Sequence, residues 1–279
     1  MIDPIILVIL ISYFIISLIY EWIYRKIIAL IQGRMGPGIL QPLTDLIKLL
    51  GKGDGYNPDF FVGLVALALT TLSLCLLPFQ NPILKSEFSL LTLFAFVITE
   101  SVIIFLSALK SGRAHLTKKS ILTNLVVTLK LPLILSLFAV GVRTKTFDLL
   151  VLAQTPNAIS APLAFLAFLL ALFAETSLAP LETLQPESEL VAGWFSGLRG
   201  RKFAIFLLNQ NLKQVLLAFV STTVFLGGGD LPAFITKSTL TLVLMAFFRG
   251  ISGRLRMDQM AAIIVKYGIP LTILQLIIP

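Results

Sequence analysis

The sequence has little charge for its size. Only 13% of its 279 residues are charged and 57% are hydrophobic, with a mean hydropathy of +0.96. A soluble domain carries roughly 25% charged residues, so this chain has too few to cover a water-facing surface. Most of its surface must face lipid instead. We therefore expect an all-α integral membrane protein, with residues 1–279 forming a single polytopic membrane domain.

Cysteine and histidine are each present once, as Cys75 and His115. One cysteine excludes a disulfide framework and a cysteine-ligated iron–sulfur cluster within this chain. One histidine argues against haem, zinc or copper held by this chain alone, and we interpret His115 as a loop or interface residue. We therefore expect no cofactor, no metal site and no catalytic residue in this chain. No basic region precedes the first apolar run, which we interpret as an uncleaved span.

Long apolar runs dominate what is present. A membrane span needs about 20 residues, and eight segments have suitable length and composition, the seventh being the shortest. No stretch between them is long enough for a folded domain outside the membrane. The predicted spans are residues 4–23, 60–79, 88–109, 120–142, 159–179, 203–226, 233–248 and 259–278.

Lysine and arginine are distributed unevenly between the loops. Cytoplasmic loops are enriched in these residues, so we expect the odd-numbered loops inside and both termini outside, in the plasma membrane of a prokaryote. The even-numbered loops hold four such residues, Lys85, Arg143, Lys145 and Lys237. The odd-numbered loops hold fifteen: Arg25, Lys26, Arg34, Lys48, Lys52, Lys110, Arg113, Lys118, Lys119, Arg199, Arg201, Lys202, Arg249, Arg254 and Arg256.

The first of these loops has helical periodicity of its own. After Gly36-Pro37-Gly38, apolar residues recur at Leu43, Leu46, Ile47 and Leu50, with polar residues on the opposite side. This spacing predicts a short amphipathic helix that lies on the membrane surface or against a partner protein. Spacing alone does not choose between lipid and a partner.

Two long motifs resemble one family. The stretch RKIIALIQGRMGPGILQPLTDLIKLLGK, which starts at Arg25, resembles the first cytoplasmic loop of the H subunit of complex I, also called NADH dehydrogenase subunit 1. The stretch AETSLAPLETLQPESELVAG at 174–193, followed by GRKFAIF at 200–206, resembles the acidic loop between the fifth and sixth spans of that family. The same family supplies a membrane subunit to energy-converting, membrane-bound nickel–iron hydrogenases and to related sulfur-reducing complexes.

The resemblance implies a non-redox subunit of a multi-subunit, ion-pumping membrane oxidoreductase. Its partners would be hydrophilic iron–sulfur and catalytic subunits on the cytoplasmic side, with antiporter-like and small membrane subunits in the bilayer. Iron–sulfur clusters, and a nickel–iron centre in the hydrogenase type, would belong to those partners. No nucleic acid is expected, despite the net charge of +8.

Several departures favour the hydrogenase branch over the quinone-reducing one. Gly36-Pro37 is followed at once by Gly38-Ile39-Leu40-Gln41-Pro42, a shorter form than in complex I. Lys130 stands where the family usually has glutamate, and Leu178 replaces a family arginine. Gln185, Gly197 and Gln210 also stand at family glutamate positions. These departures weaken the case for a quinone site and for copying the family's proton route whole.

Charged residues supply the candidate coupling path. Close carboxylates raise one another's pKa and can pass protons near neutral pH, and charges inside spans are costly and often functional. Each feature also has an alternative without a coupling role. The acidic loop could be solvated and pair with Arg199, Arg201 and Lys202, and the charges within spans could form purely structural ion pairs. We expect Glu100 and Lys130, at similar depth on consecutive spans, to form a pair. The candidates are Glu175, Glu182, Glu187, Glu189, Glu100, Lys130, Lys213 and Lys266.

Two loops are candidates for docking a peripheral arm. The resemblance places these residues in the first and fifth loops: Arg25, Arg34, Gly36, Pro37, Gln41, Asp45, Arg199 and Lys202. A stand-alone ion or solute transporter is the alternative function, since charged residues within spans also suit transporters, but the two halves show no evident repeat. A membrane enzyme acting on lipid or prenyl substrates would need paired aspartates for Mg²⁺, and the aspartates here are scattered.

Overall fold

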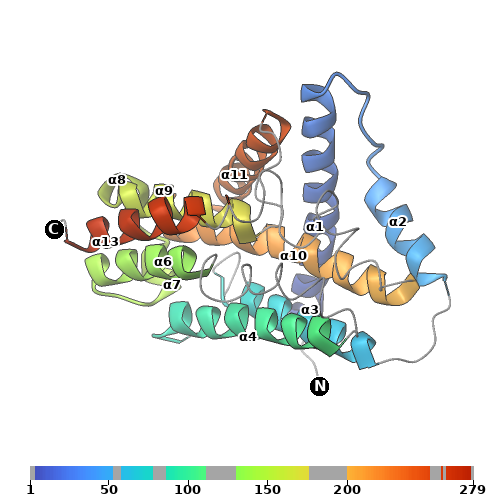
Figure 1. Cartoon of the computed structure of the whole chain (residues 1–279), viewed down its shortest axis with the longest axis horizontal. Coiled ribbons are helices and arrows are strands. Elements are labelled where there is room, and N and C mark those ends of the chain that lie inside the picture. Colours follow the sequence, from blue (N-terminus) through green and yellow to red (C-terminus); the bar gives the residue numbers. More distant parts are fainter. Residues whose placement is uncertain are drawn as a thin grey trace.

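A computed structural model describes residues 4–52, 58–77, 86–110, 130–175, 200–251, 259 and 262–277. All the regular structure in these residues is helical, as the composition predicts (Figure 1). The helices are α1 (Pro4–Ile31), α2 (Gln41–Leu50), α3 (Pro58–Cys75), α4 (Ser89–Lys110), α6 (Lys130–Thr144), α7 (Leu149–Leu152), α8 (Asn157–Ser160), α9 (Pro162–Glu175), α10 (Gly200–Val224), α11 (Leu231–Ile251), the π-helical turn η2 (Ile264–Gly268) and α13 (Ile269–Ile277).

Every predicted span contains helix in its described part. Three helical segments, in α1, α10 and α11, are long and apolar enough to cross a membrane, and four shorter apolar helices accompany them. Large apolar side chains point outward along α1, as at Val8 and Ile15, and along α11, as at Leu240 and Phe248. An apolar outer surface of this kind suits lipid. The number of spans stays a prediction.

Helix α10 lies at the centre of the molecule. It runs across the middle of the view in Figure 1, with α1, α2 and α3 toward one end and α6, α9 and α13 beside the other. Contacts join it to α1, α2, α3 and α11. Its residues from Asn211 to Val224 are all buried, so α10 has no side for lipid over that stretch. A helix buried on every side is a core element that other helices surround.

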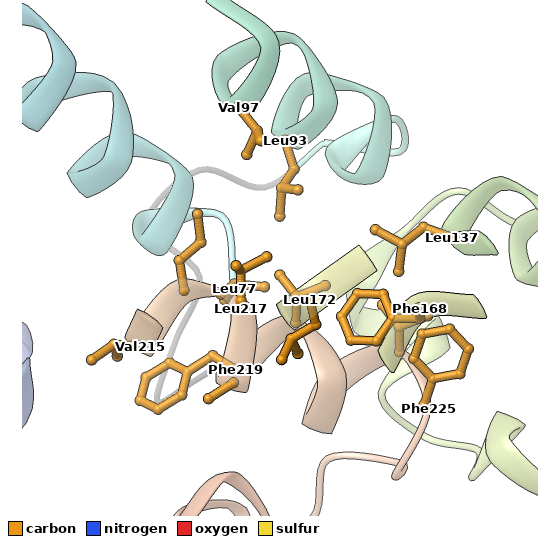
Figure 2. Packing of buried hydrophobic residues seen from close by; sticks show 14 of the residues in the cluster. Leu77, Leu93, Val97, Leu137, Phe168, Leu172, Val215, Leu217, Phe219 and Phe225 are labelled. Atoms are coloured by element: carbon orange, nitrogen blue, oxygen red, sulfur yellow. The ribbon is translucent and has the colours of Figure 1, made fainter. Parts of the chain in front are cut away.

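Aromatic packing joins the far end of α10 to α9. Phe225 follows α10, and its ring centroid lies 4.9 Å from that of Phe168 and 5.2 Å from that of Phe165. Figure 2 shows Phe168 and Leu172 of α9 facing the α10 segment that carries Leu217 and Phe219. Such offset rings contribute about 0.5–1.5 kcal/mol beyond their buried area. This packing fixes the end of α9 that precedes Glu175.

The connections between helices gather at two separate ends. Arg201 of α10 donates to the Leu50 carbonyl of α2 over 3.1 Å, and Arg249 of α11 donates to the Tyr24 hydroxyl of α1 over 3.0 Å. At the other end, the Leu90 amide of α4 donates to Phe147 and the Ala158 amide of α8 donates to Phe225. Which end faces the cytoplasm stays a prediction.

The first loop differs from its predicted outline in one respect. Helix α1 continues eight residues past the predicted end of the first span, so Arg25 and Lys26 lie on a helix and not in a loop. The chain then turns back at Gly36, whose φ is +38° and whose added Cβ would lie 2.7 Å from Lys26 Cδ. Trp22 donates to the Pro37 carbonyl over 3.2 Å. Only glycine fits this turn at low cost.

The predicted amphipathic helix is present as α2. Leu46 is 4% exposed and packs inward, because α2 rests on α10 and α1. Ile47 and Leu50 are 58% and 48% exposed, so the predicted apolar face divides between the protein interior and the surface. Helix α2 therefore has an inner face that holds it in place and an outer face that is open.

Candidate functional site

Four charged side chains meet inside the helical core. Glu100 of α4, Lys130 at the start of α6, Glu175 at the end of α9 and Lys213 of α10 are all between 1% and 6% exposed. Lys213 Nζ lies 2.6 Å from Glu175 Oε1 and 3.1 Å from Glu100 Oε2. Lys130 Nζ lies 3.1 Å from the same Glu175 Oε1. We call these four residues the charge network.

Polar groups around the charge network orient its members. Asn209, one helical turn before Lys213, donates to Glu100 Oε1 over 2.9 Å and accepts from the Thr70 hydroxyl over 2.9 Å. Ser101 donates to Glu100 Oε2 over 3.0 Å. Lys130 donates to the Val97 carbonyl over 2.7 Å and also contacts the Ser101 hydroxyl. Four helices and α3 thus hold one connected polar site.

The order of charges explains how this site is tolerated. Along the contacts the signs alternate, as Lys130, Glu175, Lys213 and Glu100, and the four formal charges sum to zero. A lone charge at the bilayer centre costs at least about 2.5–3.5 kcal/mol on insertion scales. Removing one member of a buried pair leaves the other uncompensated. An alternating, neutral chain can accept or release a proton or cation by exchanging partners between neighbours.

The predicted direct ion pair between Glu100 and Lys130 is wrong, because each residue pairs with a different partner. The two residues belong to one network, but Glu100 pairs with Lys213 and Lys130 pairs with Glu175. Helix α10 supplies Lys213 between them, and loop length along the chain gives no sign of this. Lys213 contacts two carboxylates and so connects the two pairs.

The remaining coupling candidates lie apart from the charge network or outside the described residues. Lys266 is exposed on η2, where its ammonium lies 5.5 Å from the centroid of the Tyr267 ring. Pro270, which cannot donate a backbone hydrogen bond, follows this π-helical turn and favours the irregular winding. Glu182, Glu187 and Glu189 lie outside the described residues.

The described docking candidates lie around α2 and the neighbouring ends of α1 and α10. Arg25 donates to Asp45 Oδ2 over 3.1 Å, and Gln41 donates to Asp45 Oδ1 over 3.1 Å. Arg34 is exposed, whereas Gly36 and Pro37 are half-buried in the turn. Lys202 is only 8% exposed, so it does not present its charge on an open surface. Arg199 lies outside the described residues.

Sequence reasoning missed two uncharged side chains near Lys213 and one buried glutamate near α2. Asn209 and Gln214 lie on α10 one residue or one turn from Lys213, and both are buried. Polar residues within an apolar run were the available signal. Glu21 is 7% exposed and accepts from Arg25 Nε over 2.6 Å. Its position four residues before Arg25 was the sign of a helical ion pair.

The family model described as NADH dehydrogenase matches residues 4–279, almost the whole chain. The chain belongs to this NADH dehydrogenase family. The resemblance found in its two long motifs is thereby confirmed. Because the match is continuous, α4, α6, α9 and α10, which carry the charge network, all lie within the family region.

Curated relatives agree with the family assignment, and each is an H subunit of an NADH-quinone oxidoreductase. The one from Dehalococcoides mccartyi strain CBDB1 is 30% identical over 98% of this chain and 84% of its own length. The one from Syntrophotalea carbinolica is 32% identical over 91% of this chain and 87% of its own. One from Geobacter sulfurreducens is 33% identical over 91% of this chain and 88% of its own.

A solved structure has the same fold. It is a chain of the membrane-bound sulfane sulfur reductase, an archaeal respiratory membrane complex, and it superposes with a TM-score of 0.90. The match covers 98% of this chain and 97% of that one, at 22% identity. The helices of this NADH dehydrogenase family member therefore adopt the arrangement of a chain from a membrane complex. Within the described residues, no group of three or more histidine, cysteine, aspartate or glutamate side chains is placed to hold a metal.

Proposed function

We propose that this chain is the non-redox membrane subunit of a complex I-like, ion-pumping oxidoreductase of the membrane-bound hydrogenase type. It docks a peripheral iron–sulfur and catalytic arm on the cytoplasmic side of a prokaryotic plasma membrane. It couples electron transfer in that arm to ion movement through the membrane. The observation that carries this proposal is the buried, alternating charge network in a chain of the NADH dehydrogenase family.

The charge network supports the coupling role because it is neutral, buried and contributed by four helices. A structural ion pair needs two groups, and here each of Glu175 and Lys213 serves two partners. Sharing makes the pairing depend on every member's charge, so a proton arriving at one carboxylate frees an ammonium for the next. A signal from the arm that shifts one helix would redistribute these pairs. We place the acidic residues Glu182, Glu187 and Glu189 on the same path.

The outer face of α2 supports the docking role. Met35, Ile39 and Leu40 precede α2 and are 91%, 63% and 66% exposed, and they extend the open apolar surface of Ile47 and Leu50. Arg34 lies beside them and is also exposed. Exposed apolar side chains rimmed by charge are typical of a protein interface. The single cysteine and histidine of the chain put the iron–sulfur clusters and the nickel–iron centre in the arm.

Co-purification in mild detergent tests this function directly. A tagged chain should bring down a large complex that contains iron and acid-labile sulfide, antiporter-like membrane subunits and a hydrophilic catalytic subunit. Hydrogenase activity of that complex supports the hydrogenase type. A chain that purifies alone and moves an ion or solute in vesicles would contradict the subunit role and favour a stand-alone transporter.

A further inference from the structure

A third buried carboxylate, outside the charge network, lies at the boundary between the membrane helices and α2. Glu21 of α1 is 7% exposed, and its Oε1 accepts from Arg25 Nε over 2.6 Å. Its other oxygen, Oε2, is buried and has no hydrogen-bond partner. Buried polar atoms are nearly always hydrogen-bonded. If the Glu21–Arg25 pair served only to stabilise α1, both carboxylate oxygens of Glu21 would be expected to have partners.

Arg25 connects Glu21 to α2. Its second contact is Asp45 Oδ2 at 3.1 Å, and Gln41 holds the other oxygen of Asp45. One guanidinium is therefore shared between a carboxylate buried among the helices and a carboxylate on α2, which lies beside α1 (Figure 1). The Arg25 side chain is 32% exposed, so solvent protons reach the neighbourhood of Glu21.

The other helices packed on α1 complete the surroundings of Glu21. From α10 the side-chain amide of Gln214 lies within hydrogen-bonding reach of the Glu21 carboxylate, and Gln214 Oε1 is a further buried oxygen without a hydrogen-bond partner. From α11 comes the positive charge of Arg249, whose guanidinium donates to the Tyr24 hydroxyl over 3.0 Å. The charged groups facing Glu21 among the described residues are thus Arg25 and Arg249, with Asp45 behind Arg25.

We propose that Glu21 is a proton-binding site whose occupancy is linked to docking of the peripheral arm at α2. A proton taken from solvent binds Oε2 and turns it from an acceptor into a donor, and the acceptor we assign to it is the buried oxygen Oε1 of Gln214. The same proton removes the negative charge that draws Arg25 toward α1. Arg25 then pairs with Asp45 alone and holds α2 more firmly.

This proposal rests on the proposed function, because it needs an arm that docks on α2. Linkage makes the effect reciprocal: a proton on Glu21 strengthens docking, and docking strengthens the binding of that proton. Gln214 is the neighbour of Lys213 on α10, so the Glu21 site and the charge network share one helix. Docking and the core of the membrane domain are joined through α10.

The test measures how much arm stays bound to the intact complex in mild detergent as pH is varied. The wild-type arm should dissociate more readily at alkaline pH, by a factor of at least about five across the titration. Glu21→Gln, which mimics the protonated form, should hold the arm at every pH as well as the wild type does at acidic pH. Asp45→Asn should weaken docking and flatten the profile, because Arg25 loses its surface partner.

Infrared spectra of the same preparations report the proton itself. The C=O band of a protonated carboxyl group should appear on acidification in the wild type and be missing in Glu21→Gln. Glu87→Gln is the matched control: the same change at an exposed glutamate outside both sites should keep both this band and the wild-type docking profile.

The outcomes separate this proposal from the proposed function. A Glu21→Gln complex that follows the wild-type pH profile, or that loses its arm at every pH, overturns the Glu21 site while the subunit role stands. A wild-type profile without pH dependence overturns it as well. A chain that purifies with no arm overturns both.

Discussion

The charge network and the Glu21 site are built from the same kinds of side chain but differ in how complete they are. In the charge network every charged group has an opposite charge within 3.1 Å, and the side chains are at most 8% exposed. At the Glu21 site Arg25 and Asp45 are 32% and 31% exposed, and a buried oxygen of Glu21 has no partner. Because its members share partners, the charge network can change only by rearranging several pairs together, whereas the Glu21 site can respond to a single proton or to a docking partner.

The largest expected effect comes from removing the central cation of the charge network. Lys213→Met leaves Glu100 without its ammonium partner and Glu175 with only Lys130. Breaking a buried pair from one side costs about 3–5 kcal/mol, so the free energy of unfolding in detergent should fall by about that amount. Lys266→Met makes the same change at an exposed position and should have little effect. Equal stability of the two variants would contradict a buried, interdependent network.

The two faces of α2 should respond very differently to truncation. Leu46→Ala empties a buried position and should lower the free energy of unfolding by about 2–5 kcal/mol. Ile47→Ala, next in sequence but 58% exposed, should leave stability almost unchanged and weaken retention of the peripheral arm. Thermal unfolding and arm retention measured on both variants separate the two effects. An Ile47→Ala complex that holds its arm with wild-type affinity would remove the outer face of α2 from the docking surface.

A smaller effect is expected at the end of the molecule opposite α2. The Lys237 ammonium donates to the carbonyls of Leu226, Gly227 and Gly228 at 2.9, 2.9 and 3.0 Å, which caps the turn after α10. Lys237→Met should lower the free energy of unfolding by about 1 kcal/mol. The effect is small because the site is half-exposed and water can partly replace the hydrogen bonds that the ammonium makes to the carbonyls. Thr236→Ala, at the exposed neighbouring position, is the matched control. A loss as large as that of Lys213→Met would show that this turn is part of the core.

Much of the fold follows from composition and periodicity. Apolar runs about 20 residues long become helices because lipid forces every backbone group to bond internally, and α2 follows from its helical spacing. The topology inferred from the uneven loop charges stays a prediction. The structure does not describe several connecting segments, among them residues 53–57, 111–129 and 176–199, the last of which holds most of the acidic loop.

The sites were predictable in membership but not in pairing. Glu100, Lys130, Glu175 and Lys213 are ionisable residues within or beside apolar runs, which is enough to mark them as costly and interior. Which carboxylate meets which ammonium depends on Lys213 of α10 lying between Glu100 of α4 and Glu175 of α9, and that arrangement is a tertiary property. Glu21 was missed because it lies near the end of an apolar run, where a charge can reach the interface without a partner.

The most direct test of the central claim is the number of ions moved per electron in proteoliposomes containing the purified complex. Both proton and sodium flux are recorded beside the electron-transfer rate, for Glu100→Gln and for Glu87→Gln, the same change at an exposed glutamate. If the charge network couples the two processes, Glu100→Gln should lower the ion-to-electron ratio severely while Glu87→Gln keeps the wild-type ratio. A wild-type ratio in Glu100→Gln, at an unchanged electron-transfer rate, would contradict that role.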